Sequence, residues 1–200
     1  MMAKVDIYSG FLGAGKTTLI KKLLKDGYDN EQVVLIENEF GEIGIDSGFL
    51  ADAGINITEM NSGCICCTLV GDFAVALEKV ITEFDPDRIL IEPSGVGKLS
   101  DVAEAVMDVD GCDIASMVTV VDARKCRLYH KNFGEFFNNQ IESAGTVVLS
   151  HTDSVDEDTL KTALDIVKEL NDEAKLITSP WDELSGDHIL AEFAPGKQVE

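Results

Sequence analysis

The amino-acid sequence predicts an α/β fold built in three layers, with helices on both faces of a mostly parallel central sheet. Three observations lead to this prediction. Short runs rich in β-branched residues alternate along the chain with segments of helical period. Several of these runs are apolar almost throughout, which is typical of strands that are buried on both faces. A glycine-rich segment joins the first run to the first helical pattern.

The apolar runs and the periodic segments place the expected elements along the chain. Strands are expected over Val5–Tyr8, Val33–Glu37, Ile55–Glu59, Arg88–Ile91, Ala115–Val121, Thr146–Leu149 and Lys175–Thr178. Helices are expected over Thr17–Lys25, Leu69–Phe84, Leu99–Met107, Phe133–Ser143 and Glu157–Leu170. No pattern is visible from Trp181 onward. We therefore expect one domain over residues 1–180 and, over residues 181–200, a tail that caps the sheet edge or a linker.

Length and charge restrict the class of protein. A chain of 200 residues suffices for one well-packed domain and is too short for two large ones. Its 37 Asp and Glu residues outnumber its 16 Lys and Arg residues, so the net charge is −21. Such a surface repels the phosphates of DNA and RNA, which argues against a nucleic-acid partner.

The sequence shows no sign of export or of membrane insertion. The apolar stretch before Ser9 is interrupted by Asp6 and lacks a signal-type cleavage site. No apolar run approaches the roughly 20 residues of a membrane helix. We therefore expect a cytoplasmic protein without a membrane partner. In that reducing compartment, clustered cysteines indicate metal binding or redox chemistry rather than disulfides.

The segment from Gly10 to Thr17 has the pattern of a phosphate-binding loop, with a strand before it and a helix after it. Glycines let the backbone curl so that its N–H groups face a β-phosphate, and the helix N-terminus adds positive potential. Lys16 is expected to bridge the β- and γ-phosphates, and the Thr17 hydroxyl to bind Mg²⁺. A chance match in a glycine-rich turn is the alternative. The predicted nucleotide-binding residues here are Gly10, Gly13, Ala14, Gly15, Lys16, Thr17 and Thr18.

An acidic residue at the end of a later strand completes this prediction. Glu92 follows the expected strand Arg88–Ile91, and a carboxylate there is costly unless it is paired or lies near a metal. We expect Glu92 to reach the Mg²⁺ shell. Gly95 can offer its backbone N–H to a γ-phosphate, which would make this segment a switch. The alternative is a Glu that faces water.

The third motif is Cys64-Ile65-Cys66-Cys67. Thiolates bind Zn²⁺, Cu⁺ and similar ions tightly, and the preceding Asn-Ser-Gly permits the loop to bend around one ion. Such a set leaves a coordination position for a ligand from elsewhere, which suits a site that releases its metal. Buried apolar cysteines and a redox pair are the alternatives. Cys112 and Cys126 stand alone and are interpreted as core or incidental residues.

Several segments carry a family resemblance in their order and spacing over roughly the first 150 residues. They are Gly10–Leu19, Ile36–Asp46, Asn61–Cys67, Ile91–Gly95 and Thr119–Ala123. With these segments the chain resembles the nucleotide-binding domain of the CobW-like GTPases, the metallochaperone relatives of HypB and UreG. The Cys-x-Cys-Cys signature joined to a phosphate loop is specific to that family.

The resemblance implies a GTPase that binds zinc, cobalt or a similar divalent metal and delivers it to a client protein. It implies that Glu37 to Asp46 forms the first switch, with Asp46 near the Mg²⁺ and the γ-phosphate. Asp46 and Glu92 are thus candidates for positioning the attacking water. The implied ligands of the transported metal are Cys66, Glu37 and Glu42, with Cys64 and Cys67 as further thiols. Homodimers are common among such relatives.

Two departures from the family pattern matter. Guanine-specific relatives carry Asn-Lys-x-Asp after the sixth strand, whereas this chain reads Ser150-His151-Thr152-Asp153. Asp153 can still accept hydrogen bonds from guanine, His151 replaces the lysine that covers the base, and Ser150 is expected to lose a bond to the phosphate loop. We predict GTP over ATP, with reduced discrimination. The chain also ends before the C-terminal domain that family members usually carry.

Three functions remain compatible with the sequence. The first is a GTP-hydrolysing metallochaperone. The second is a regulatory G-protein that gates a client such as a cobalamin-dependent enzyme. The third is a phosphate-loop kinase for a small molecule, although no Arg-rich lid is visible.

Overall fold

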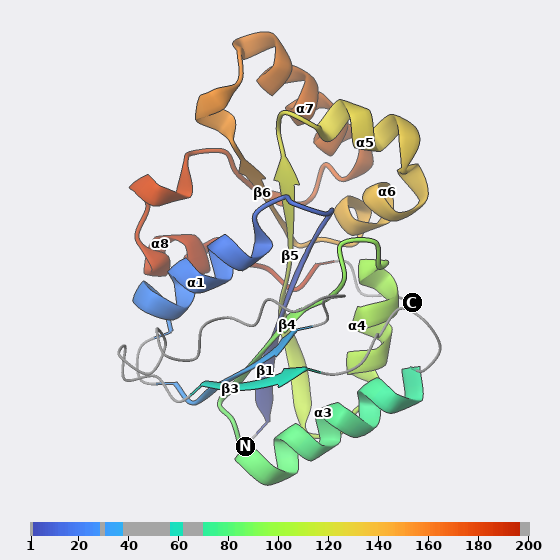
Figure 1. Ribbon diagram of the computed structural model, residues 1–200, viewed down its shortest axis with the longest axis vertical. Helices are drawn as coiled ribbons and strands as arrows, with labels where there is room; N and C mark the ends of the chain where they lie inside the picture. Colours follow the sequence, from blue (N-terminus) through green and yellow to red (C-terminus); the bar gives the residue numbers. More distant parts are fainter. Residues whose placement is uncertain (1, 29–30, 38–56, 62–69, 197–200) are drawn as a thin grey trace.

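The computed structural model describes residues 2–28, 31–37, 57–61 and 70–196. Its centre is one sheet of parallel strands in the order β3-β2-β4-β1-β5-β6-β7 (Figure 1). The strands are β1 (Ala3–Gly10), β2 (Val33–Glu37), β3 (Ile57–Asn61), β4 (Arg88–Glu92), β5 (Cys112–Asp122), β6 (Thr146–Ser150) and β7 (Lys175–Ile177). Because all the strands run in one direction, their carboxyl ends share one edge of the sheet.

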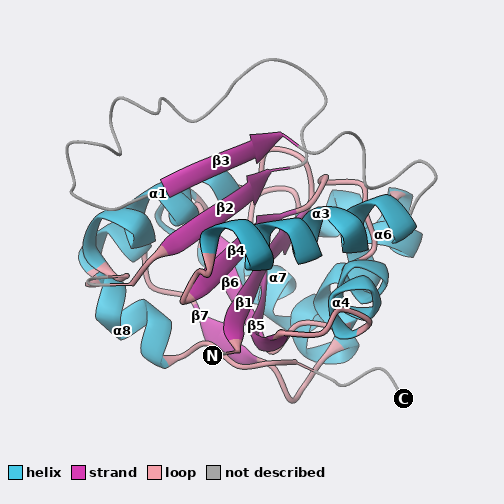
Figure 2. Cartoon of the chain, turned by 90° about the horizontal axis from the view of Figure 1, so that it is seen from below, coloured by secondary structure: helices cyan, strands magenta, loops and turns pink. Residues whose placement is uncertain are grey.

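Helices cover both faces of this sheet (Figure 2). They are α1 (Lys16–Asp26), α3 (Val70–Phe84), α4 (Leu99–Met107), α5 (Cys126–Asn132), α6 (Gly134–Glu142), α7 (Glu157–Leu170) and α8 (Gly186–Ala191). Leu19, Ile20 and Leu23 of α1 pack with Ile189 of α8 in the core on one face. The core on the other face is formed with side chains of α3, α4, α6 and α7. The predicted three-layer α/β/α architecture is confirmed.

The expected strands and longer helices are present, with boundaries shifted by a few residues. The spans of β2, α4 and α7 coincide with their predicted ranges. The short helices α5 and α8 were not predicted, because a helix of about two turns is too short to show a clear hydrophobic period. After β7, the chain returns to the sheet: the backbone N–H of Met117 donates to the carbonyl of Ala194, at 2.9 Å. No described helix is both long and apolar enough to cross a membrane.

Cys112 and Cys126 are core residues, as the sequence indicated. Both thiols are free and buried. Burial, with a smaller contribution from the negative charge of Asp113, raises the pKa of Cys112 to about 11. Burial, reinforced by Asp122, raises the pKa of Cys126 to about 12. Neither thiol is therefore an effective metal ligand or nucleophile at neutral pH.

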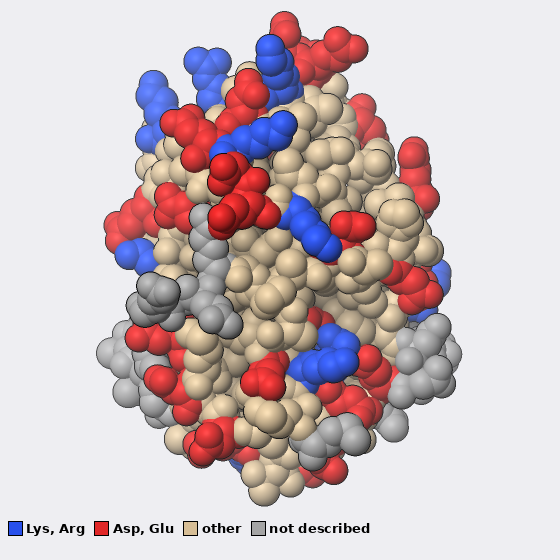
Figure 3. Space-filling model, turned by 180° about the vertical axis from the view of Figure 1, so that it is seen from behind, with Lys and Arg blue, Asp and Glu red and all other residues tan. Residues whose placement is uncertain are grey.

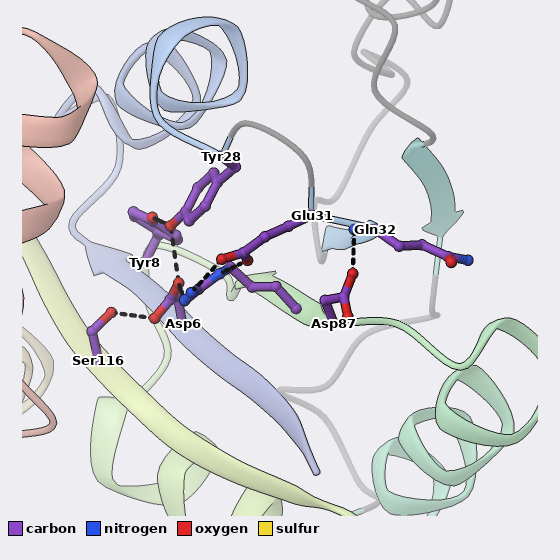
Figure 4. Close-up of polar contacts among 8 residues, drawn as sticks. Asp6, Tyr8, Tyr28, Glu31, Gln32, Asp87 and Ser116 are labelled. Carbon is purple, nitrogen blue, oxygen red and sulfur yellow. Dashed lines mark hydrogen bonds and ion pairs between the residues drawn. The ribbon is translucent and has the colours of Figure 1, made fainter. Parts of the chain in front are cut away.

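A buried polar cluster ties β1 to its neighbours away from the carboxyl edge (Figure 4). Asp6, only 2% exposed, accepts hydrogen bonds from Tyr28 at 2.9 Å, Ser116 at 2.6 Å and Arg88 at 2.6 Å. Tyr28 also bonds to the buried Tyr8 hydroxyl, and Arg88 also forms an ion pair with Glu31. Burial disfavours the charged guanidinium, but the hydrogen bonds and charges of both carboxylates raise the pKa of Arg88 above its usual value.

Because of the two tyrosines in this cluster, we expect the protein to lose stability at alkaline pH. Burial and then the negative charge of Asp6 raise the pKa of Tyr8 well above its usual value, and burial and then Tyr8 do so for Tyr28. Above pH ~10 the unfolded chain loses both phenol protons while the folded chain keeps them. Below pH ~10 these two groups do not change the free energy of unfolding. Above it, the free energy of unfolding should fall by up to ~1.4 kcal/mol per pH unit for each tyrosine.

Urea unfolding at a series of pH values between 8 and 11 measures this slope. Tyr28→Phe removes one of the two groups and should make the slope shallower. A slope identical in the two proteins would contradict the assignment.

Candidate nucleotide and metal site

The phosphate loop joins the end of β1 to the start of α1 at the carboxyl edge of the sheet. Gly10, Gly13 and Gly15 have φ values of 146°, 71° and 110°, which side chains other than glycine rarely allow. At Gly10 a Cβ atom would lie 2.5 Å from the carbonyl oxygen of Val120 on the adjacent strand. The loop therefore requires glycine both for its conformation and for its close approach to β5.

Lys16 begins α1 and lies folded against the loop. Its side chain is largely buried, and its ammonium group donates to the carbonyl of Gly10 at 2.8 Å. A contact to the carbonyl of Phe11 is longer, at 3.5 Å. A cation held over a curled loop at a helix N-terminus forms a site for a polyanion.

Thr17 and Glu92 are brought into direct contact across the site. The Thr17 hydroxyl donates to Oε1 of Glu92 at 2.8 Å, and Glu92 is 1% exposed. A buried carboxylate beside a hydroxyl offers the oxygen ligands that Mg²⁺ prefers. The residues present therefore fit a magnesium ion at this position.

Glu37 lies beside Glu92 in the sheet. It ends β2, pairs in register with Glu92 on β4 and with Asn61 on β3, and is 8% exposed. Because side chains alternate along a strand, Glu37 lies on the same face as Leu35, and Glu92 lies on the same face as Leu90. Leu35 and Leu90 both belong to the core beneath α1. The two carboxylates thus share the face of the sheet that carries the phosphate loop.

The segment after β4 packs against the phosphate loop and is held by α6. A Cβ atom at Gly95 would lie 2.8 Å from the backbone nitrogen of Leu12, so only glycine fits there without movement. Gln140, fully buried, donates to the carbonyls of Gly95 at 3.0 Å and Gly97 at 2.9 Å. Gln140 was missed by the sequence analysis, because a polar residue in a helix gives no signal of what it contacts.

At Ser150, the last residue of β6, the structure differs from the sequence prediction. Ser150 was expected to lose a bond to the phosphate loop, but its hydroxyl donates to the carbonyl of Ala14 at 2.6 Å. The expectation was wrong because β6 ends close enough to the loop for a short side chain to reach it. His151 is exposed with a φ of 58°, and Asp153 is exposed beside it. The Asp153 carboxylate accepts a hydrogen bond from the Ser154 hydroxyl at 3.2 Å.

Asp122 at the end of β5 is a further buried acid at this edge. It is 3% exposed and accepts three hydrogen bonds from Arg124, through Nη2 at 2.8 Å, Nε at 3.0 Å and the backbone N–H at 3.0 Å. Burial raises the pKa of Asp122, but the hydrogen bonds and the charge of Arg124 lower it by a larger amount, so the pKa lies below its usual value. Asp122 is therefore ionised at neutral pH.

Several predicted site residues lie outside the described part of the chain. They are Glu42, Asp46, Cys64, Cys66 and Cys67. Within the described ranges, no group of three or more His, Cys, Asp or Glu side chains could hold a metal ion. The roles predicted for the cysteines and for both switch acids therefore stay predictions.

Comparison with known proteins places this geometry in a family. The model of the CobW/HypB/UreG nucleotide-binding domain matches residues 4–178. The zinc chaperone YeiR of Escherichia coli is 34% identical over 155 residues, which cover 76% of this chain and 47% of that protein. The zinc chaperone CobW of Pseudomonas aeruginosa is 31% identical over 215 residues, covering 90% of this chain and 57% of that protein. The chain thus spans about half the length of these curated relatives.

Solved structures agree on the fold. The Zn(II)-bound YjiA GTPase from Escherichia coli superimposes with a TM-score of 0.67 at 18% identity, over 100% of this chain and 67% of that one. The hydrogenase maturation factor HypB from Archaeoglobus fulgidus gives 0.59 at 18% identity, over 93% of this chain and 85% of that one. With the family model matching most of its length, the chain belongs to the CobW/HypB/UreG nucleotide-binding domain family.

Proposed function

We propose that the chain is the nucleotide-binding part of a GTP-hydrolysing metallochaperone, which binds zinc or cobalt through Cys64, Cys66 and Cys67 and delivers it to a client protein in the cytoplasm. One observation carries the proposal: Glu37, Glu92 and Asn61 lie side by side at the carboxyl ends of three adjacent strands. Glu92 contacts the phosphate-loop Thr17, and the cysteine segment begins right after Asn61. Names of relatives such as zinc chaperone support the same function.

The nucleotide half of the function follows from the loop. Backbone N–H groups of the loop would donate to the β-phosphate, and the Lys16 ammonium, now bonded to the Gly10 carbonyl, would turn to the γ-phosphate. Thr17 and Glu92 would hold Mg²⁺, which neutralises charge on the phosphates when bound. The buried Glu92 and the Asp46 of the switch are the candidates for orienting the attacking water.

The metal half depends on Glu37. Glu37 is the first residue of the predicted switch segment and pairs with Glu92 in the sheet. A metal held by Glu37, Glu42 and the thiols would therefore share a wall with the Mg²⁺ position. Two bound cations so arranged influence each other's affinity, and this coupling is reciprocal. Hydrolysis can then change the affinity for the transported metal and promote its release.

The abundance of acidic side chains supports a cation as cargo rather than a nucleic acid as partner. Asp and Glu outnumber Lys and Arg in the sequence, 37 to 16. Figure 3 shows Asp and Glu side chains spread over the face that it displays, with fewer Lys and Arg side chains between them. Such a surface attracts metal cations and repels phosphate backbones.

Zinc titration of the reduced protein tests this function. We expect tight binding that changes about tenfold between the GDP and the Mg²⁺–GTP states, because typical coupling energies correspond to such factors. Cys66→Ala should abolish tight binding, whereas Cys112→Ala, which removes a buried thiol, should leave it intact. A zinc affinity that is the same in both nucleotide states and unchanged in Cys66→Ala would contradict metal delivery and would favour a regulatory GTPase instead.

The base preference is a separate prediction. Asp153 accepts hydrogen bonds from the N1–H and the exocyclic amine of guanine, whereas adenine has no donor at N1. We expect GTP to bind about tenfold more tightly than ATP, since a bond to a charged acceptor is lost with adenine. Competition against a labelled guanine nucleotide measures the ratio. Asp153→Asn should reduce it, and equal affinities in the unmodified protein would refute the guanine assignment.

A further inference from the structure

The single tryptophan of the chain lies at the nucleotide site. Trp181 begins a short 3₁₀ turn, Trp181–Glu183, soon after β7 ends at Ile177. β7 pairs with β6, whose end carries Ser150 and then His151 to Asp153. Trp181 and the predicted base-binding segment therefore follow two adjacent strand ends at one edge of the sheet.

The indole ring contacts the phosphate loop directly. A Cβ atom built on Gly15 would lie 3.0 Å from Cη2 and 3.4 Å from Cζ2 of Trp181, and 3.9 Å from Cβ of Ser150. The benzo edge of the ring therefore covers the glycine that precedes Lys16. Trp181 is only partly buried, and it packs with Leu184 against the core beneath α1. Trp181 thus places a large apolar ring, in a residue that is not fully buried, against the loop.

We propose that Trp181 binds the base of the nucleotide and forms an apolar wall of the base site beside Asp153. The assignment rests on the proposed GTP site. A nucleotide whose phosphates lie on the loop amides at Gly15 and Lys16 must extend its base toward Asp153 to use that carboxylate. Trp181 and Ser150 flank Gly15 at the start of this path. Indole rings stack on nucleic-acid bases, whereas Ser150, His151 and Asp153 supply polar groups.

Intrinsic fluorescence tests this assignment, because one residue emits the whole tryptophan signal. GDP should change the emission of the unmodified protein, whereas inorganic tripolyphosphate, which occupies the loop without a base, should leave it nearly unchanged. Trp181→Ala should weaken GDP binding about tenfold in calorimetry, the usual size of a lost stacking contact. The constant for inhibition of GTP hydrolysis by tripolyphosphate should be the same in Trp181→Ala as in the unmodified protein. Trp181→Phe should retain most of the GDP affinity.

Leu184→Ala is the matched control, since it loosens the same segment without touching Gly15. It should bind GDP like the unmodified protein. In GTP hydrolysis, Trp181→Ala should raise KM with kcat within about twofold, as expected for a group that binds substrate equally in the ground and transition states.

Four outcomes would overturn the assignment. The first is normal GDP affinity in Trp181→Ala, and the second is tighter GDP binding there, which would mean that the ring blocks the base site. The third is an equal loss of tripolyphosphate affinity, which would make Trp181 a support of the loop. The fourth is the same loss in Leu184→Ala. An unmodified protein that binds tripolyphosphate but no GDP would instead overturn the proposed function, and this assignment with it.

Discussion

Replacing Lys16 by alanine should lower the rate of GTP hydrolysis at least a hundredfold. Its ammonium group is the side-chain cation that the structure places over the phosphate loop, 2.8 Å from the Gly10 carbonyl. Removing one preorganised donor from a developing charge commonly costs two to three orders of magnitude in kcat. Phosphate release under saturating GTP and Mg²⁺ measures the loss, and calorimetry with GDP separates lost binding from lost chemistry.

The control must remove a lysine from the same helix without changing the site. Lys25 lies in the last turn of α1 and is exposed. Lys25→Ala should therefore hydrolyse GTP at the rate of the unmodified protein. Circular dichroism should show the same helix content in both variants, because α1 keeps its buried face of Leu19, Ile20 and Leu23. Turnover within threefold of normal in Lys16→Ala would show that the loop is not catalytic.

The fold could be predicted because its signals are local. Runs such as Val33–Glu37 are apolar at every position before their last and rich in β-branched residues, which is typical of a strand buried on both faces. The phosphate loop was visible because Gly10 and Gly15 meet conformational demands that few residues meet. A parallel sheet then places the carboxyl ends of β1, β2 and β4 at one edge. The location of Lys16, Glu37 and Glu92 at that edge therefore follows from the order of strands and loops along the chain.

The rest of the site depends on distances between segments far apart in the chain. Ser150 is shorter than the residue it replaces, and its bond to Ala14 depends on how closely β6 approaches the loop. Gln140 lies on α6, and its contact with Gly95 follows from how that helix packs. Trp181 belongs to a segment without periodicity, so nothing in the sequence connects it to Gly15. Such contacts are products of tertiary packing and carry no local sequence signal.

The largest expected effect on stability comes from the buried cluster around Asp6. Asp6→Ala should lower the free energy of unfolding by about 3–5 kcal/mol, the usual cost of removing one partner from a buried ion pair. Arg88, whose side chain is 13% exposed, would lose its ion pair with Asp6 while keeping the ion pair with Glu31 and its position over the Tyr28 ring. The Tyr28 and Ser116 hydroxyls would each lose an acceptor. Against a total stability of roughly 5–15 kcal/mol, this loss is severe.

Urea unfolding followed by far-ultraviolet circular dichroism measures this effect. Lys79→Ala is the matched control, because it breaks an exposed ion pair, the 3.9 Å contact to Glu83, and should cost less than ~0.5 kcal/mol. Asp6→Asn keeps the shape and one acceptor oxygen, so its cost should lie between the two. The cluster lies away from the phosphate loop, so Asp6→Asn should keep normal GDP affinity at temperatures where it is folded. A loss near 0.5 kcal/mol for Asp6→Ala would mean that water replaces the carboxylate and that the cluster contributes little to the fold.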